Sequence, residues 1–216
     1  MLTLYDFLNK NILDEIIGIT KEGKESVILA GKKGKKYVAI KIYRTEACDF
    51  KTMWKYLVGD PRFFRVKKAR RSVVNTWCQR EFKNLMIATK AGVACPKPIA
   101  FKENVLIMSF IGENGVSAPM LIDVILKPED IDYVYKLVTN EMKKLFKAGL
   151  IHGDASEYNI LSDRGRIVFI DFSQAVTLKH PSAIEFLKRD VHNIARYFQR
   201  QGMVISEKEI YDKIVK

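Results

Sequence analysis

The sequence predicts an α+β fold with two lobes, a small N-terminal lobe rich in antiparallel strands and a mainly helical C-terminal lobe. Apolar and β-branched residues alternate along much of 15–43, as they do in half-buried strands. From residue 128 onward, apolar residues recur mostly at helical spacing. An apolar strand over 105–111 connects the two patterns. With 216 residues, of which 48 % are hydrophobic, the chain is long enough to bury a core.

The expected N-terminal lobe begins with a short amphipathic helix within residues 1–13. Strands are expected at 15–19, 26–30 and 37–43, with turns rich in Gly and Lys between them. Helical spacing predicts one longer helix over 73–90, which Gly92 is expected to end. These elements form an antiparallel meander accompanied by one long helix.

Residues 44–72 lack clean periodicity and are interpreted as an irregular basic insertion. Gly59-Asp60-Pro61 is a strong turn signal within it. Such a charge run can follow an RNA backbone, although it is also typical of a solvated surface. Phe63 and Phe64 are expected either to stack on bases or to pack. The basic side chains are Arg62, Arg65, Lys67, Lys68, Arg70 and Arg71.

The expected C-terminal lobe begins with a helix over 128–148 that Gly149 ends. Two short strands, 159–161 and 167–170, are joined by a hairpin turn at 162–165. Two further helices follow, and each starts with the spacing of a capping box. The capping pairs are Ser182 with Glu185 and Ser206 with Glu209.

Composition sets broad limits on function. The formal charge of +12 favours polyanionic partners such as nucleic acid or nucleotide phosphates. The three cysteines lie far apart, without metal-ligand spacing, and are interpreted as unpaired thiols in a reducing compartment. No apolar run approaches the roughly 18 residues of a membrane span, and the N-terminus lacks a signal-peptide cleavage site. We therefore expect a cytoplasmic protein.

One loop carries a carboxylate and an amide five residues apart. Asp154 and Asn159 lie between a predicted helix and a predicted hairpin. Phosphoryl transfer needs a group that orients and deprotonates the nucleophile and an oxygen ligand for Mg²⁺, and the D-x-x-x-x-N spacing is typical of kinase catalytic loops. The alternative is a turn in which both side chains only bond the backbone.

A second carboxylate follows the apolar strand 167–170. Asp171 comes at the end of that strand, where a buried element would hold it rigidly. Because Mg²⁺ prefers carboxylate and phosphate oxygens, the sequence predicts a metal ligand here. A turn-capping aspartate is the alternative.

Lys41 lies inside the β-branched strand Val38-Ala39-Ile40-Lys41-Ile42. This matches V-A-I-K, whose lysine pairs with nucleotide phosphates and with a helix glutamate. Glu81 in the predicted helix 73–90 is the expected partner. An outward-facing strand lysine is the alternative.

The expected phosphate loop is the least regular motif. Gly18 and Gly23 are present, but the middle glycine of the kinase pattern G-x-G-x-x-G is absent. Backbone N–H groups of such a turn still cradle phosphate where its conformation permits. Ile28 would then pack over the adenine, whereas a plain hairpin turn is the alternative.

Taken together, these residues resemble the RIO family of atypical protein kinases, in particular its first branch. The resemblance covers nearly the whole chain. The matching segments are Gly23-Lys24-Glu25-Ser26, Lys41-Ile42-Tyr43-Arg44, Trp77 to Leu85, Met108 to Gly112, His152 to Leu161, Ile170 to Val176, His180-Pro181, Glu185-Phe186-Leu187 and Arg189-Asp190.

The resemblance implies a two-lobed protein-kinase-like fold and a serine/threonine kinase or ATPase that uses ATP with Mg²⁺, or Mn²⁺, in small ribosomal subunit maturation. It implies one domain over 1–216, with the N-lobe at 1–108, a hinge at 108–112 and the C-lobe at 113–216. It makes Asp154 the base, Asn159 and Asp171 the metal ligands, and Asp171 also a phosphoryl acceptor. The nucleotide-binding residues it implies are Gly23, Lys24, Glu25, Ser26, Ile28, Lys41, Glu81 and the backbone of Ser109 and Ile111.

The sequence also departs from ordinary protein kinases. His-Arg-Asp is replaced by His152-Gly153-Asp154, and Asp-Phe-Gly by Asp171-Phe172-Ser173. Only 45 residues follow Asp171, so we expect a reduced C-lobe without the peptide-binding helices. Three alternatives stay open: a small-molecule phosphotransferase of the aminoglycoside type, the small kinase of the tRNA-modifying KEOPS complex, and a silent nucleotide-binding module.

Overall fold

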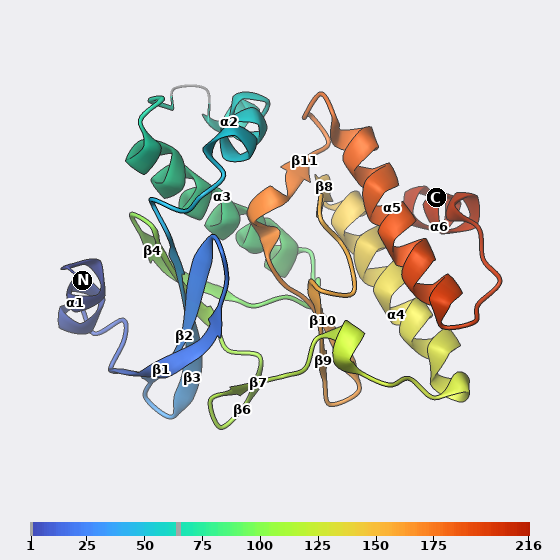
Figure 1. Cartoon of the computed structure of the whole chain (residues 1–216), viewed down its shortest axis with the longest axis horizontal. Coiled ribbons are helices and arrows are strands. Elements are labelled where there is room, and N and C mark those ends of the chain that lie inside the picture. The colour runs from blue at the N-terminus through green and yellow to red at the C-terminus, as the bar shows by residue number, and fades with distance from the viewer. Residues whose placement is uncertain (1, 64–65) are drawn as a thin grey trace. The chain divides into compact units, whose positions relative to one another are not determined.

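The computed structural model describes residues 2–63 and 66–216, which contain both helices and antiparallel sheet (Figure 1). The chain folds into two compact units. Unit 1 comprises Met1–Met86 and Pro96–Ser117, and unit 2 comprises Ile87–Cys95 and Ala118–Lys216. The predicted α+β class is confirmed. The unit boundaries differ from the expected lobes, because residues 87–95 belong to unit 2 and residues up to Ser117 belong to unit 1.

Unit 1 is built on a five-stranded antiparallel sheet with strand order β1-β2-β3-β5-β4. Each predicted strand is present, and the first three are longer than expected. Strand β4 and the small β6–β7 hairpin were not predicted. The strands are β1 Glu15–Glu22, β2 Ser26–Lys33, β3 Lys36–Tyr43, β4 Pro98–Lys102, β5 Val105–Ser109, β6 Gly112–Glu113 and β7 Val116–Ser117.

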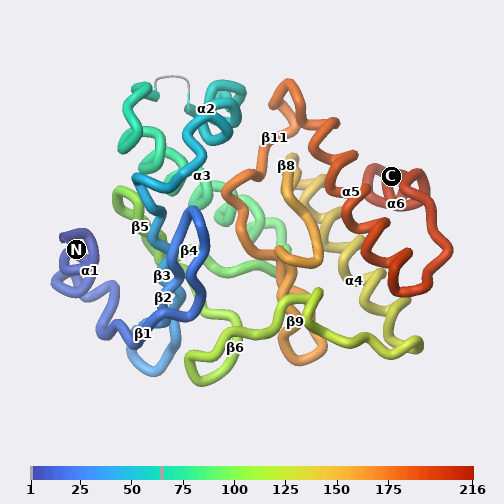
Figure 2. Tube along the Cα trace, viewed as in Figure 1, coloured from blue at the N-terminus to red at the C-terminus, as the bar shows by residue number. Residues whose placement is uncertain are grey.

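The two faces of the central strand β3 have different surroundings. Val38 and Ile40 point into a core formed with β5 and with Phe7 of helix α1 (Leu2–Asn9). Because side chains alternate along a strand, Lys41 and Tyr43 point to the opposite face. There they meet helix α3 (Arg70–Lys90), whose residues up to Met86 belong to unit 1. The chain trace can be followed in Figure 2.

The prediction of an irregular insertion over 44–72 is wrong. Residues Phe50–Val58 form helix α2, Pro61–Phe63 form the 3₁₀ turn η1, and α3 already begins at Arg70. The Asp49 side chain caps α2 by accepting a hydrogen bond from the Thr52 N–H at 3.1 Å. The helix buries Met53, Tyr56 and Leu57, whose spacing is helical but too short to stand out in the sequence.

A buried ion network attaches the turn after α2 to α3. The Asp60 carboxylate accepts from the Arg62 guanidinium at 2.6 Å and from Nε of the fully buried Arg80 at 3.3 Å. Burial alone raises the pKa of Asp60, but the hydrogen bonds and charge of Arg62, together with Arg80, hold it below its usual value. Burial lowers the pKa of Arg80 to about 10, against the pull of Asp60. Arg62 is therefore a structural residue and not a freely exposed phosphate ligand.

Unit 2 is mainly helical. Helix α6 (Glu207–Val215) packs against α4 (Pro128–Lys147) and α5 (Ala183–Arg200). Two short strand pairs accompany the helices, namely β8 (Leu150–Ile151) with β11 (Val176–Thr177) and β9 (Ile160–Asp163) with β10 (Arg166–Phe169). The 3₁₀ turns η2 and η3 span Leu121–Asp123 and Phe172–Gln174. The predicted hairpin and all three predicted helices are confirmed.

The two predicted capping boxes have different outcomes. Ser206 and Glu209 form the reciprocal pair at the start of α6. Ser182 precedes α5 but makes no side-chain cap, so that prediction is wrong. Its backbone N–H instead donates to Nδ1 of His180 at 3.1 Å, because the preceding turn brings the imidazole to this position.

Among the helices of the described residues, none combines the length and the apolar character that crossing a membrane requires.

Candidate active site

The lysine predicted to contact phosphates is buried in unit 1 and paired as expected. Lys41 Nζ lies 2.9 Å from Oε1 of Glu81, and both side chains are almost fully buried. The hydroxyl of Tyr43 donates to the other carboxylate oxygen, Oε2. The Lys41 ammonium also lies 5.0 Å from the centre of the Tyr43 ring. Tyr43 was not singled out from the sequence, although its place two residues after Lys41 puts it on the same strand face.

The β1–β2 turn holds the residues of the predicted phosphate loop. Gly23 donates its N–H to the Ser26 carbonyl at 2.9 Å, and the Glu25 carbonyl accepts from the Arg44 N–H at 2.8 Å. Lys24 and Glu25 are exposed at the tip. Gly18 is not in the turn but inside β1, beside a register shift. Ile28 pairs across the sheet with Lys41 and therefore lies on the same face.

The predicted hinge residues lie at the C-terminal end of β5 and just after it. The N–H of Ser109 donates to the Lys97 carbonyl at 2.8 Å, and its hydroxyl accepts from the Lys97 N–H at 2.8 Å. The Ser109 N–H is thus engaged within unit 1. Ile111 follows the strand and is half-buried.

The residues of the predicted catalytic loop meet in unit 2. Asn159 Nδ2 donates to the Asp154 carbonyl at 2.9 Å and to Asp154 Oδ2 at 3.0 Å. Gln174 Nε2 donates to the same Oδ2 at 3.3 Å. Because the Asn159 nitrogen faces Asp154, its amide oxygen points elsewhere and suits a metal ligand.

Asp171 adopts a backbone conformation that is rare for residues with a side chain. Its φ of 60° is left-handed, and its Oδ1 accepts from the Ser173 hydroxyl at 2.6 Å. The preceding N–H, of Ile170, donates to the Asn159 carbonyl at 2.9 Å, which joins the two predicted metal-ligand segments. Strained conformations of this kind persist where surrounding structure fixes them, often at functional sites.

The donor set fits Mg²⁺. An amide oxygen from Asn159 and a carboxylate from Asp171 are hard oxygen ligands, and Mg²⁺ usually takes only one or two carboxylates together with substrate phosphates. Within residues 2–63 and 66–216, no group of three or more His, Cys, Asp or Glu side chains is arranged to hold a metal ion. A site completed by nucleotide phosphates is consistent with both observations.

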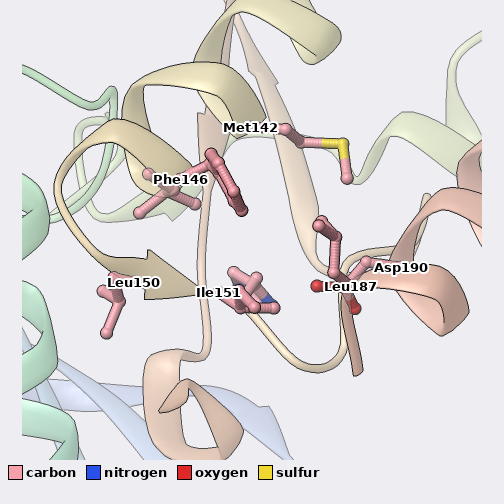
Figure 3. A pocket seen from close by; sticks show the side chains of 8 residues that line it. Met142, Phe146, Leu150, Ile151, Leu187 and Asp190 are labelled. Atoms are coloured by element: carbon pink, nitrogen blue, oxygen red, sulfur yellow. The ribbon is translucent and has the colours of Figure 1, made fainter. Parts of the chain in front are cut away.

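Asp190 of α5 anchors the backbone of the predicted catalytic loop. Its carboxylate oxygens accept from the Gly153 N–H at 2.8 Å and from the Ala155 N–H at 2.9 Å, so they grip the backbone on both sides of Asp154. Burial raises the pKa of Asp190 to about 7, against the pull of these two N–H groups and of Arg189. Figure 3 shows Asp190 beside a small cavity that apolar side chains of α4, β8 and α5 line. Asp190 lies in one of the segments that resemble the family, but the sequence assigned it no role.

The glycine of His152-Gly153-Asp154 has a physical cause. Gly153 has a φ of +77°, and a Cβ placed there would lie 2.7 Å from the Gln174 carbonyl oxygen. A side chain such as the arginine of other kinases therefore does not fit. The neighbouring His152 contacts the Ile170 carbonyl through Nε2 at 3.0 Å and packs edge-on to Phe172.

The basic residues of the predicted RNA-binding segment do not act alike. Lys67 and Lys68 are exposed, and Lys68 lies 5.8 Å from the Trp54 ring centre. Arg70 donates to the Glu46 carbonyl at 2.5 Å, and Arg71 pairs with Glu103 at 3.2 Å. Phe63 is buried and packs. Phe64 and Arg65 lie outside the described residues.

A buried strand lysine paired with a helix glutamate, a D-x-x-x-x-N loop and a strand-end aspartate define a phosphotransferase of the protein-kinase class. The family model of the RIO domain matches residues 26–210. The chain therefore belongs to the RIO family of protein kinases, and its relatives place it with the RIO1 type.

The relatives support this assignment over nearly the whole chain. The "RIO-type serine/threonine-protein kinase Rio1" of Methanocaldococcus jannaschii is 44 % identical over 217 residues, which cover 99 % of this chain and 73 % of that protein. The protein of the same name from Thermoplasma acidophilum is 39 % identical, over 85 % of this chain and 96 % of its own. The Rio2 kinase of Chaetomium thermophilum, solved as an ADP/Mg²⁺-phosphoaspartate complex, aligns with a TM-score of 0.73 at 25 % identity. That alignment covers 100 % of this chain and 66 % of that one.

Proposed function

We propose that residues 1–216 form a single kinase domain that uses ATP and Mg²⁺ both to phosphorylate serine or threonine and to hydrolyse ATP. The observation that carries the proposal is the network in unit 2, where Asp154, Asn159 and the Asp171 segment are tied together by named hydrogen bonds. A silent nucleotide-binding module needs no such arrangement of base and metal ligands.

Each residue has a defined task in this proposal. Lys41, fixed by Glu81, holds nucleotide phosphates, and the β1–β2 turn of Gly23, Lys24, Glu25 and Ser26 lies against them. The turn offers backbone N–H groups other than that of Gly23, which donates to the Ser26 carbonyl. Ile28 packs against the adenine ring. The edge of the adenine meets backbone groups of Ile111 and the carbonyl of Ser109. Asn159 and Asp171 would hold Mg²⁺, which would supply positive charge to neutralise the charge that develops on the transferred phosphoryl group. Asp154 accepts the proton of the attacking hydroxyl.

We also propose that Asp171 accepts a phosphoryl group. Its carboxylate oxygen attacks the γ-phosphorus, the bond to the β-phosphate oxygen breaks, and ADP leaves. Water then attacks the phosphorus and Asp154 takes a proton from it. The bond between Asp171 Oδ and phosphorus breaks, the Asp171 carboxylate is regenerated and inorganic phosphate leaves. The phosphoaspartate in the Chaetomium Rio2 complex supports this route by likeness.

The partner we propose is a precursor of the small ribosomal subunit, contacted through its RNA. The net charge of +12 and the exposed Lys67, Lys68, Arg70 and Arg71 support a polyanionic partner. All three cysteines are free, which fits a reducing compartment such as the cytoplasm.

A phosphate-release assay tests the enzymatic proposal. With ATP and Mg²⁺, Asp154→Ala and Asp171→Ala should each reduce turnover at least about 100-fold, while the exposed-surface variant Lys147→Ala should keep it. Unchanged turnover in Asp171→Ala would rule out both of its proposed roles. Acid-labile, hydroxylamine-sensitive ³²P on wild type but not on Asp171→Ala is expected for the phosphoaspartate.

The ribosomal proposal needs a separate assay. Small-subunit particles should stimulate phosphate release, and changing Lys67, Lys68, Arg70 and Arg71 together to Ser should weaken particle binding and flatten its salt dependence. The matched control changes Lys143, Lys147, Lys188 and Lys208, which lie on helices of unit 2, to Ser. Equal salt slopes for both quadruple variants would show that the basic segment is only a solvated surface.

A further inference from the structure

The Gln174 side chain lies between a hydrogen-bond donor, Arg189, and an acceptor, Asp154, which belong to different segments of unit 2. Gln174 is the last residue of η3, three residues after Asp171, and is half-buried. Its Nε2 donates to Asp154 Oδ2 at 3.3 Å, and its Oε1 accepts from Arg189 Nη2 at 3.4 Å. The side chain thus connects α5 to the aspartate proposed as the base.

The chemistry of the two neighbours selects an amide at this position. A guanidinium has only donors, and an ionised carboxylate has only acceptors. An amide meets both demands, and Arg189 decides its orientation, because the oxygen must face the guanidinium and the nitrogen must then face Asp154. A glutamate here would keep the contact to Arg189 but would place a second negative charge against Asp154.

Both ends of this bridge are themselves held. Arg189 also donates to the Gly153 carbonyl, and its neighbour Asp190 accepts from the N–H groups of Gly153 and Ala155. Asp154 Oδ2 accepts from Asn159 as well, at 3.0 Å. Two amides from two different segments therefore converge on one carboxylate oxygen, which fixes the plane of the carboxyl group.

We infer that Gln174 is a positioning residue for Asp154, a role that rests on the proposed function of Asp154 as the base. A base must lie within hydrogen-bond reach of the proton it takes, and a displacement of about 1 Å costs on the order of 100-fold in rate. Gln174 acts through Asp154 and needs no contact of its own with nucleotide. Its loss should therefore lower kcat and leave nucleotide binding intact.

Steady-state phosphate release tests this role with two substitutions. Gln174→Ala removes the amide, whereas Gln174→Glu keeps its size and removes the donor. Both should lower kcat by about 10- to 100-fold, the rate equivalent of a hydrogen bond to a charged group. The KM for ATP should stay within about twofold of wild type. The control is Gln199→Glu on α5, which removes an amide that donates to the Ile205 carbonyl. This variant should retain wild-type kcat.

The Glu substitution separates positioning from packing. A residue that only fills space would tolerate an isosteric carboxylate, so wild-type kcat in Gln174→Glu overturns the inference. If Gln174→Ala fails to fold by circular dichroism, Gln174→Glu alone decides the question.

A double-mutant comparison shows whether Gln174 acts through Asp154. In an Asp154→Ala background, adding Gln174→Ala should cause no further loss of the residual phosphate release. A second loss as large as that in the wild-type background overturns the inference, even if kcat falls in the single variant. The proposed function fails separately, by wild-type turnover in Asp154→Ala itself.

Discussion

The candidate site residues of the two units are held by different physical means. In unit 1, Lys41 and Glu81 sit on a central strand and a long helix, and their ion pair is buried. In unit 2, Asp154 and Asn159 sit on a loop whose backbone is gripped by side chains of α5. The first arrangement depends on two residues and the packing around them. The second depends on partners that are remote in sequence, and chief among these is Asp190.

This difference predicts how each region fails. Breaking the buried pair in unit 1 should destabilise the fold as well as disturb the phosphate contact proposed for Lys41. Disturbing the anchors in unit 2 should release a loop while the helices beneath it stay packed.

Glu81→Ala should cost about 3–5 kcal/mol of unfolding free energy, because it leaves the buried Lys41 ammonium without its carboxylate. Denaturant unfolding measures the change. Glu15→Ala is the matched control, since Glu15 pairs with Lys32 at 3.8 Å on the surface of the same sheet. That variant should lose less than about 1 kcal/mol. Equal losses in the two variants would show that burial does not govern the unit 1 pair.

Asp190 should make the stability of the protein depend on pH. Its pKa is about 7 in the folded chain, whereas an unfolded aspartate has a pKa of about 4. Between these values the folded state binds more protons than the unfolded state, so the free energy of unfolding should fall as pH rises. The full loss is at most about 4 kcal/mol. Above pH 7 this contribution should be constant.

Asp190→Asn isolates that contribution, because asparagine has nearly the same size and does not titrate. Unfolding free energies of both proteins, measured from pH 4 to pH 8, should show wild type losing stability relative to the variant up to about pH 7. Parallel curves would mean that another group causes the pH dependence.

Gly153→Ala should cost about 2–3 kcal/mol, the sum of the left-handed φ and the close approach to the Gln174 carbonyl. Gly149→Ala is matched in conformation, since its φ is +75° and nothing lies within 4 Å of its added Cβ. It should cost only about 1 kcal/mol. The difference between the two variants, from thermal or denaturant unfolding, reports the contact with Gln174. No difference would mean that the loop shifts to accept the methyl group.

Much of the fold followed from local patterns, and the misses have physical reasons. The long amphipathic α4 and the strand β3 were predicted because their periodicity extends over many residues. Helix α2 was missed because it has nine residues and its exposed Val58 obscures the apolar pattern. The β6–β7 hairpin was missed although its turn contains an Asn-Gly pair, which favours the positive φ that Asn114 and Gly115 both have.

The residues of the candidate site also divide into those that local sequence patterns predicted and those that they did not. Lys41, Glu81, Asp154, Asn159 and Asp171 were named because spacing along the chain encodes them. Residues that act through tertiary contact have no such spacing. Asp190 reaches across 37 residues to Gly153, and only the folded backbone shows that the two meet. The roles of all these residues stay predictions until the variants are measured.

Tyr43→Phe gives the smallest expected effect and the finest test of the unit 1 arrangement. It removes only the hydroxyl that donates to Glu81 Oε2, so it should cost about 1.5 kcal/mol of unfolding free energy. The KM for ATP should rise, because Glu81 then constrains Lys41 less firmly. Tyr37→Phe, on the same strand, is the matched control and should change stability by less than about 0.5 kcal/mol. If Tyr43→Phe raises the KM as little as Tyr37→Phe does, the Lys41–Glu81 pair is positioned by strand and helix alone. In that case secondary structure alone would position the site residues of unit 1, whereas side chains of α5 anchor those of unit 2.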